Sequence, residues 1–462
     1  MPTYLDVAAV RIQSYIARTP ALRLRRGASR LLTTTTSAAA VSAWLADAGL
    51  PVDALNEDAG EADGVISLIV APGSEQRVAQ TAMLWMREHL PSVELQAVWA
   101  TAGSYLEAYP LLAAQRSRPL VALPQFADFS LGETCAECRV DLRSAGELCA
   151  DCRARDTAGR RTTSRGSQAE PSEASATEQD LLHAVTRSTN AKLRPVRHFG
   201  DLAQAGEGTG NRNHVATVAM DGNGMGAFFS VLAGTGDVDV KRRISPAISA
   251  ATRSALHTAT LGIIQPDDRW LPVVPHVLGG DDVVVSVVAD RAWDFTHEFL
   301  DAFSRELTRT GTELGLPPEV LSQIPSMSAG LVFAHVKFPY ARAVHLAEQM
   351  LRRAKQDTAG AEAALCWLDV TDDGEALPSW RRAFTQRELA ERTDALGELA
   401  GLGNTALQVL RRLLASGTDE EATAAVLSWA RRNNHPGIQP LLTGLPLDDL
   451  RGLAALTRWW RP

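Results

Sequence analysis

The stretch Leu278-Gly279-Gly280-Asp281-Asp282-Val283-Val284-Val285 sets two glycines and two adjacent aspartates between two apolar runs. The preceding run, residues 270–277, and the following run, 283–288, are short and rich in β-branched residues, which is typical of strands. Two consecutive glycines supply the backbone freedom that a tight turn needs. We therefore predict a β-hairpin with Asp281 and Asp282 at its tip.

The two adjacent carboxylates of this hairpin repel each other and are poorly suited to a core, so a bound cation is the expected partner. Hard oxygen ligands favour Mg²⁺ or Mn²⁺. A solvated acidic turn is the simpler alternative, because average composition should produce this tetrapeptide in roughly one chain of this length per hundred. The meaning of the hairpin therefore depends on what surrounds it.

The overall composition is that of an ordinary globular protein with several folded units. The chain has 462 residues, and typical domain sizes suggest about three units. It is 45% hydrophobic and 22% charged, with no uninterrupted apolar run long enough to cross a bilayer. The first residues have neither the basic region nor the apolar core of a signal peptide, so we expect a cytoplasmic protein without membrane partners.

Charge and polarity vary along the chain. The net charge of −8 argues against a protein that coats nucleic acid non-specifically. Two basic segments, 11–30 and 153–165, are candidates for contact with a nucleic acid or an acidic partner, with a solvated surface as the usual alternative. Residues 157–179 have almost no large apolar side chain and predict a flexible linker.

The clearest order of elements lies around the hairpin. Strand 215–220 is followed by a helix at 244–261, the hairpin, a helix around 295–303, and strand 328–334. An apolar stripe from 343 to 354 predicts another helix, and 364–370 a further strand. The order is βαββαβ with extensions, which predicts an α+β fold of the ferredoxin-like type, an antiparallel sheet with helices on one face.

The N-terminal part can be laid out in the same order. It has strand 4–12, helix 37–48, a weak second strand near Asp53, strand 65–70, helix 75–89 and strand 94–100. At the position of the hairpin it carries Ala59-Gly60-Glu61-Ala62-Asp63-Gly64, which has no adjacent acidic pair. We interpret it as a degenerate second copy, although many α+β domains fit this order loosely.

These patterns divide the chain into five parts. We predict a first unit at 1–125, a cysteine module at 126–156, a linker at 157–194, a central unit at 195–375 and a helical domain at 376–462. The last assignment follows from leucines near helical spacing that are interrupted by glycine-rich turns.

A third carboxylate follows from the strand order of the central unit. Asp221 ends strand 215–220, which lies beside the hairpin in this topology, so Asp221, Asp281 and Asp282 should converge. Three such carboxylates suit two-metal nucleotidyl transfer, in which one Mg²⁺ or Mn²⁺ activates a 3′-hydroxyl and the other neutralises the departing pyrophosphate. Glycines beside them would let a triphosphate approach the backbone, unless they only form a turn. The predicted nucleotide-binding residues are Gly222, Asn223, Gly224, Met225, Gly226, Gly279 and Gly280.

The cysteines give a separate signal. Cys135-x-x-Cys138 and Cys149-x-x-Cys152 form two knuckles ten residues apart, which fits a tetrahedral Zn²⁺ site with a structural role. A disulfide or a redox pair is the alternative. Cys366 lies in an apolar strand and is expected to be simply buried.

Several of these motifs, in this order, resemble the large, polymerase-like subunit of type III CRISPR effector complexes. In the first unit the resemblance rests on the stretches at 10–16 and 26–29. In the central unit it rests on Asp221-Gly222-Asn223-Gly224-Met225-Gly226, Gly279-Gly280-Asp281-Asp282, Ser328-Ala329-Gly330, His335-Val336-Lys337-Phe338-Pro339 and Leu346-Ala347-Glu348. The resemblance covers most of residues 1–372, and the helical tail carries no motif.

The resemblance implies a chain with two palm domains, of which the second, 195–375, makes cyclic oligoadenylates from ATP with two Mg²⁺ or Mn²⁺ ions. The residues that match its catalytic motif are Asp221, Asp281 and Asp282. Guide or target RNA and other effector subunits would be partners. Members commonly begin with a nuclease domain that bears a His-Asp pair, and this sequence has no His-Asp dipeptide, so we do not expect DNA cleavage. The alternatives are a catalytically silent scaffold of an RNA-guided complex and a stand-alone cyclase that makes a cyclic mono- or dinucleotide.

Overall fold

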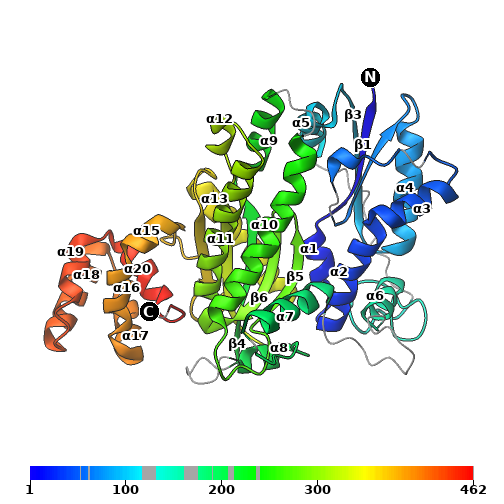
Figure 1. Cartoon of the computed structure of the whole chain (residues 1–462). Coiled ribbons are helices and arrows are strands. Elements are labelled where there is room, and N and C mark those ends of the chain that lie inside the picture. Colours follow the sequence, from blue (N-terminus) through cyan, green and yellow to red (C-terminus); the bar gives the residue numbers. More distant parts are fainter. Residues whose placement is uncertain are drawn as a thin grey trace.

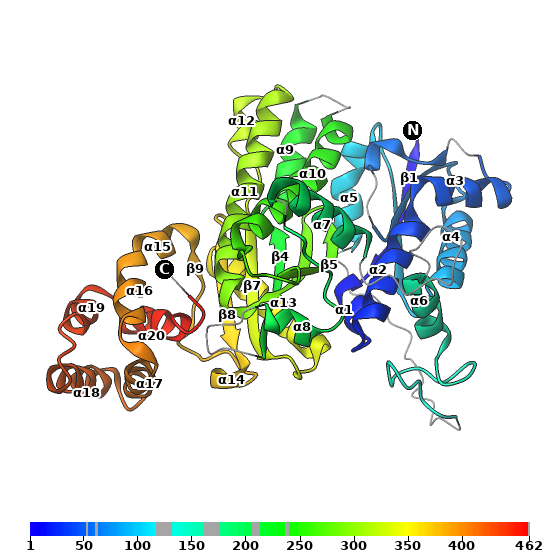
Figure 2. The same ribbon diagram turned by 60° about the horizontal axis from the view of Figure 1, so that its bottom comes forward.

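The structure is a computed structural model that describes residues 1–51, 54–60, 63–116, 132–160, 175–189, 191–205, 213–235 and 240–460. The first unit, the central unit and the C-terminal helices follow one another in a row, with the chain ends at opposite sides of the molecule (Figures 1 and 2). In the described part of the chain, every helix is too short or too polar to span a membrane.

The central unit is built on a six-stranded sheet in the order β5-β6-β4-β7-β8-β9. All neighbours are antiparallel except β7 and β8, which are parallel. Strands β4, β5, β6 and β7, with the helices between them, have the predicted βαββαβ topology. Strands β8 and β9 extend the sheet beyond β7. The strands are β4 (His214–Gly222), β5 (Val273–Gly279), β6 (Asp282–Val288), β7 (Met327–His335), β8 (Ala364–Asp369) and β9 (Phe384–Thr385).

Helices cover both faces of this sheet, so the prediction of helices on one face is wrong. Val218 and Met220 of β4 pack in the core formed with α10 (Val240–Ile263) and α11 (Ala292–Glu313). The intervening Ala219 packs in the core that contains α13 (Tyr340–Asp357), on the opposite face. A parallel step from β7 to β8 needs a crossover helix, and strands covered on both sides are apolar without alternation.

Helix α13 lies unusually close to the sheet because β7 has a glycine under it. A Cβ built on Gly330 would be 2.1 Å from the carbonyl oxygen of Ala347. A larger residue there would push α13 off the sheet, so Gly330 sets the height at which the end of α13 reaches the strand ends.

The first unit has a three-stranded antiparallel sheet in the order β2-β1-β3. The predicted strand near Asp53 lies outside the described residues, and next to it Leu55 makes only an isolated bridge to Leu68. Of the stretch 59–64, which has no adjacent acidic pair, residues 61 and 62 also lie outside the described residues. The elements are β1 (Thr3–Val10), α1 (Ile12–Ala17), α2 (Leu22–Thr36), α3 (Ala38–Asp47), η2 (Glu57–Ala59), β2 (Val65–Val70), α4 (Glu75–His89), β3 (Glu94–Thr101) and α5 (Tyr105–Arg116).

The predicted linker is partly helical. Residues 157–160 end α6 (Ala150–Arg160), and α7 (Ala176–Thr189) buries Leu181 and Val185 in the core of the central unit. Residues 161–174 and 190 lie outside the described residues. Leu181 and Val185 lie beyond the polar run 157–179, so that run does not exclude the helix that follows it.

Three arginines of the two basic segments, Arg25, Arg26 and Arg155, are buried and so are not part of a basic surface, whereas Arg11 and Arg153 are exposed. Arg26 is buried and donates to both carboxylate oxygens of Glu178, at 2.7 and 2.5 Å. Arg155 is fully buried and pairs with Asp151 at 2.7 Å. The Arg26 pair joins α2 to α7, and Arg155 also donates to the carbonyl of Tyr15 in α1 at 2.8 Å, so these buried charges hold helices together.

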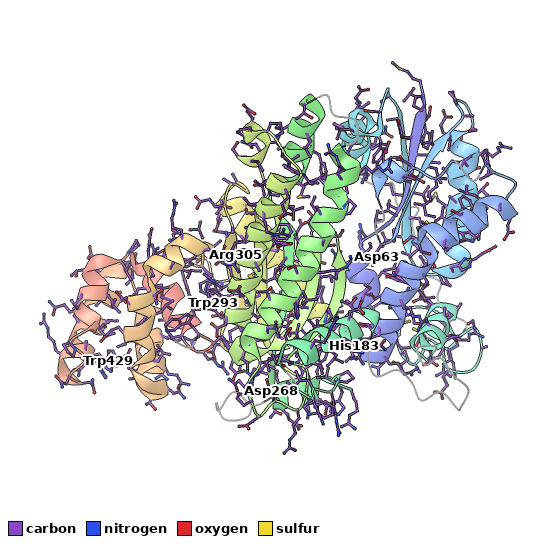
Figure 3. The ribbon with its side chains drawn as sticks, viewed as in Figure 1. Asp63, His183, Asp268, Trp293, Arg305 and Trp429 are labelled. Atoms are coloured by element: carbon purple, nitrogen blue, oxygen red, sulfur yellow. The ribbon has the colours of Figure 1, made fainter. Side chains whose placement is uncertain are left out.

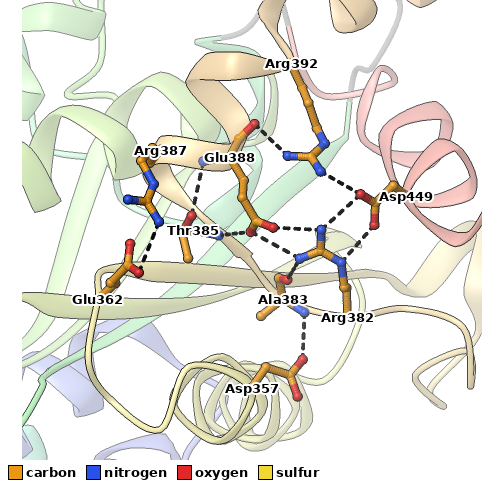
Figure 4. Close-up of polar contacts among 9 residues, drawn as sticks. All are labelled: Asp357, Glu362, Arg382, Ala383, Thr385, Arg387, Glu388, Arg392 and Asp449. Carbon is orange, nitrogen blue, oxygen red and sulfur yellow. Dashed lines mark hydrogen bonds and ion pairs between the residues drawn. The ribbon is translucent and has the colours of Figure 1, made fainter. Parts of the chain in front are cut away.

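Residues 386–456 are mainly helical and are anchored to the central sheet. The Trp459 ring stacks on Phe333 with centroids 4.7 Å apart, and its indole N–H donates to Asp369 at 2.8 Å. Arg382 and Arg392 bond the buried Asp449 in a network that joins β9 to the last helix (Figure 4). The helices are α15 (Gln386–Glu391), α16 (Thr393–Ala400), α17 (Gly403–Leu414), α18 (Asp419–Arg432), α19 (Ile438–Gly444) and α20 (Leu447–Leu456).

Short elements complete the fold. They are α8 (Phe199–Gln204), α9 (Met225–Gly234), η3 (Ala289–Arg291), α12 (Pro318–Leu321) and α14 (Val370–Asp373).

Candidate active site

The hairpin between β5 and β6 has the predicted form. Gly279 pairs with Asp282, which leaves Gly280-Asp281 as a two-residue turn, and φ at Gly280 is +59°. Strand β6 pairs with β4 up to Val283 opposite Met220, so the next residues, Asp282 and Asp221, leave the two strands side by side. The structure therefore brings all three predicted aspartates to one edge of the sheet.

Burial, and after it the repulsion from Asp221, disfavours the charged forms of Asp281 and Asp282. Burial, followed by the charge of Asp221, raises the pKa of Asp281 to about 6. The same two causes raise the pKa of Asp282 to about 7. Carboxylates with raised pKa values in a cleft are typical of functional sites, and a divalent cation is the partner that would relieve them.

Asp281 folds back over the glycine that follows Asp221. A Cβ built on Gly222 would lie 2.6 Å from Oδ2 of Asp281 and 2.8 Å from Cγ of Met225. Any side chain at position 222 would therefore force the Asp281 carboxylate out of its present position.

Two further side chains contact the aspartates, and the sequence analysis did not assign a role to either. The Lys355 ammonium, in the last turn of α13, donates to Oδ2 of Asp221 at 2.5 Å and to the carbonyl of Gly222 at 2.7 Å. Gln13, in α1 of the first unit, donates from Nε2 to Oδ2 of Asp282. Lys355 directly follows the apolar stripe that predicted α13, and Gln13 lies within the stretch 10–16, so each was adjacent to a detected signal.

Of the predicted nucleotide-binding residues after Asp221, Met225 and Gly226 already belong to α9. The buried Asn223 side chain donates to Ser326 and to the carbonyl of Glu362, at 2.9 and 3.0 Å. It therefore holds the loop to the rest of the unit. Gly224 has φ +66°, and Gly226 faces open space. A nucleotide contact here would come from backbone N–H groups at the start of α9.

A cavity of about 310 Å³ lies between the hairpin and the first unit. One wall is formed by the hairpin with α9 and α10, through Gly280, Asp281, Asp282, Phe229 and Ser249. The opposite wall comes from the first unit and includes Asp63, which Figure 3 places at this junction. No sequence motif indicated this wall. Its polar residues are Asp6, Ser29, Asp63, Ser67, Tyr105, Tyr109 and Arg116.

Asp6 is the centre of that wall. It is buried, and it accepts hydrogen bonds from Ser67 at 2.6 Å, from Tyr105 at 3.0 Å and from Arg116 at 2.9 Å. A carboxylate held by three donors is fixed in place. The first unit therefore presents a polar surface to the cavity, and its acidic residues among the described lining, Asp6 and Asp63, are not adjacent in sequence.

The four predicted zinc ligands lie together in a separate module. Cys135, Cys138, Cys149 and Cys152 are buried, unbridged, and have sulfurs that all lie within 4.8 Å of one another. The sulfurs of Cys138 and Cys149 are 3.8 Å apart. Two sulfurs bound to tetrahedral zinc at about 2.3 Å would be about 3.8 Å apart, so the residues fit Zn²⁺.

Within the described part of the chain, these cysteines form the one group of three or more residues close enough to share an ion. Asp221, Asp281 and Asp282 do not form such a group here, and Asp221 is bonded to Lys355 and Asp282 to Gln13. Metal binding at the aspartates would therefore require Lys355 and Gln13 to give up these contacts.

We expect the purified protein to contain one zinc ion per chain by elemental analysis. Cys138→Ser should lower the zinc content and the melting temperature, because four-thiolate sites contribute directly to folding. Cys366→Ser is the matched control, since Cys366 is buried in β8, far along the chain from the module. Zinc-free protein with an unchanged melting temperature would contradict the assignment.

Comparison with known proteins agrees with this geometry. Residues 214–363 match the family model of Cas10/Cmr2, second palm domain. A search of curated proteins finds no match.

Solved structures extend the similarity to the whole chain. The apo Csm1–Csm4 cassette matches with 14% identity and a TM-score of 0.58, over 100% of this chain and 70% of its own. The Csm1–Csm4 cassette in complex with cA4 matches with 14% identity and a TM-score of 0.59, over 100% and 70%. Csm1 from T. onnurineus matches with 16% identity and a TM-score of 0.57, over 99% and 69%.

At these identities the solved structures establish the fold alone, and the family match covers the part of the chain that holds the three aspartates. Residues 214–363 are thus a second palm domain of the Cas10/Cmr2 family, carried in a chain that has the fold of Csm1.

Proposed function

We propose that the protein is a metal-dependent nucleotidyltransferase that joins ATP into cyclic oligoadenylates in type III CRISPR-type defence. The observation that carries the proposal is the placement of Asp221, Asp281 and Asp282 on adjacent strand ends of a Cas10/Cmr2 second palm domain, beside a cavity. Related Csm1–Csm4 cassettes have been solved in complex with one ATP, pppApApA and cA3.

The three aspartates are the proposed ligands of Mg²⁺ or Mn²⁺. When bound, two such ions would lower the pKa of a 3′-hydroxyl and stabilise the charge on the α-phosphate and departing pyrophosphate. The backbone at Gly222–Gly226 and the start of α9 would bind the triphosphate, because N–H groups at a helix start favour phosphate. The cavity between the two units would orient the reacting nucleotides, which lowers the entropic cost of the reaction.

Each step forms one phosphodiester bond and releases one pyrophosphate. The 3′-oxygen of one nucleotide attacks the α-phosphorus of another, the bond from that phosphorus to pyrophosphate breaks, and the hydroxyl proton leaves to solvent. Ring closure repeats the same exchange within one chain. No side chain has to form a covalent bond to substrate, which agrees with a site composed of carboxylates.

The test is to incubate the purified protein with ATP and Mn²⁺ or Mg²⁺ and to identify products by mass spectrometry. We expect pyrophosphate and a cyclic 3′,5′-linked oligoadenylate, and neither with an Asp281→Ala, Asp282→Ala double variant. A cyclic mono- or dinucleotide would instead support a stand-alone cyclase of another class. Identical traces for wild type and double variant, also when a Csm4-like subunit and RNA are co-purified, would support a silent scaffold.

A further inference from the structure

Helix α1 joins the first unit to one of the proposed metal ligands. It lies at the junction of the first unit and the central unit, where it contacts α13 (Figures 1 and 2). Its Gln13 side chain donates from Nε2 to Oδ2 of Asp282. The first unit therefore occupies an oxygen that a metal ion at Asp282 would use.

The cysteine module holds the other end of α1. The Tyr15 hydroxyl donates to Oδ1 of Asp151 at 3.1 Å, and Asp151 lies inside the second Cys-x-x-Cys knuckle. The Arg155 side chain donates to the carbonyl of Tyr15 at 2.8 Å, and its Cζ lies 4.1 Å from the centre of the Tyr15 ring. Arg18, which follows α1, pairs with Asp141 of the module at 2.5 Å. The position of α1 therefore depends on the folded state of the module.

The backbone enters α1 in a strained conformation. Arg11, between β1 and α1, has φ +55° and ψ +43°, which is the left-handed region that disfavours a residue with a Cβ. Its side chain forms an exposed ion pair with Glu94 at 3.4 Å, which contributes little to stability. Such strain persists where surrounding contacts impose it, and it is characteristic of functional and switching segments. The contacts at both ends of α1 are the ones that impose it here.

The two sets of contacts reinforce each other. A donor that is already held in place forms a stronger hydrogen bond than a free one, because less conformational freedom is lost when the bond forms. The contacts of the module with Tyr15 and Arg18 therefore strengthen the bond from Gln13 to Asp282. A cation that needs this carboxylate oxygen has to overcome both the hydrogen bond and the contacts that fix its donor.

We propose that the Gln13–Asp282 bond is an inhibitory contact that the zinc module maintains through α1. This inference rests on the proposed function, because it takes Asp282 as a metal ligand. It gives the module an effect on the active site in addition to the stability of its own loop. It also requires that metal at the aspartates loosens α1, since a coupling between two sites acts equally in both directions.

The test titrates the full, zinc-loaded chain with Mn²⁺ and follows binding by electron paramagnetic resonance, with the Asp281→Ala, Asp282→Ala variant as the blank. Gln13→Ala should bind Mn²⁺ about tenfold more tightly than wild type, from the loss of a hydrogen bond to a charged group. Gln76→Ala is the matched control and should bind as wild type does, because Gln76 is exposed on α4 of the same unit.

Tyr15→Phe tests the connection to the module. It removes the bond to Asp151 and keeps the ring that Arg155 covers, so it should tighten Mn²⁺ binding by about threefold. If Tyr15 acts through Gln13, the Gln13→Ala, Tyr15→Phe double variant should bind no more tightly than Gln13→Ala. Independent effects would multiply to about thirtyfold and would overturn the connection.

Hydrogen exchange of residues 11–18 gives a readout that needs no activity. Saturating Mn²⁺ should reduce the protection of these amides in wild type, and Gln13→Ala should show reduced protection without Mn²⁺. Unchanged or weaker Mn²⁺ binding by Gln13→Ala would overturn the inhibitory contact. If wild type binds no more Mn²⁺ than the blank, the proposed function fails. Reduced protection in Gln13→Ala would then still support a bond that holds α1 to the central unit, and unchanged protection would overturn it.

Discussion

Replacing Asp281 and Asp282 together by asparagine should abolish nucleotide joining and, without divalent metal, should make the protein more resistant to heat. Burial and the charge of Asp221 raise the pKa of Asp281 to about 6 and that of Asp282 to about 7. Charged carboxylates at neutral pH are therefore a cost to the folded state, which the neutral amides remove. We expect a gain of about 1–3 kcal/mol, visible as a higher melting temperature in the presence of a chelator.

The pH dependence of this gain has a definite sign. An unfolded aspartate has a pKa of about 3.9. Because the folded-state pKa values are higher, the wild type is relatively most stable below about pH 4 and loses this stability as the pH rises to about 7. The advantage of the double variant should thus be small at pH 4.5 and fully developed at pH 8. An advantage that is equal at both pH values would contradict this account.

Divalent metal should make the wild type more stable than the double variant. At a Mn²⁺ concentration of about 100 times its Kd, wild type would gain about 2.7 kcal/mol from binding, and the double variant would gain little. Asp267→Asn is the matched control, because Asp267 is exposed in the turn that follows α10 and should change neither activity nor stability. A double variant that keeps both its activity and its response to Mn²⁺ would exclude these aspartates as the metal site.

The hairpin and Asp221 were predictable because the information is local. Two strands with a Gly-Gly turn specify the hairpin, and the βαββαβ order specifies which strand lies beside it. Lys355 and Gln13 were not predictable in the same way. Gln13 comes from the first unit, 269 residues before its partner Asp282, and Lys355 depends on how closely α13 lies on the sheet. Such contacts are set by tertiary packing, which periodicity does not report.

The arginines of α2 and α6 illustrate a second limit. Their number predicts a basic surface, yet Arg25, Arg26 and Arg155 are buried. Arg25 lies over the Tyr340 ring with its Cζ 3.8 Å from the ring centroid, and Arg26 faces Glu178. Counting charges along the chain cannot show which acidic and aromatic side chains the fold places against these arginines.

Gly222→Ala should reduce nucleotide joining by about 100-fold with little loss of stability. The new Cβ would be 2.6 Å from Oδ2 of Asp281 and 2.8 Å from Cγ of Met225, both of which are movable side-chain atoms. The backbone at position 222 is not in the left-handed region, so alanine itself is not strained there. The methyl group would instead force the Asp281 carboxylate out of its present position, and a displacement of about 1 Å at a reacting centre can cost about 100-fold in rate.

Gly262→Ala is the matched control for this variant. Gly262 lies in α10 of the same unit, and a Cβ there meets nothing within 4 Å. It should keep full activity and gain slightly in stability, since alanine is favoured over glycine within a helix by about 1 kcal/mol. The comparison isolates the position of one carboxylate from the general effect of an added methyl group. Full activity of Gly222→Ala would mean that Asp281 does not act from the position that it holds against Gly222. Loss of activity together with unfolding would mean that Gly222 is needed for the fold and not specifically for the site.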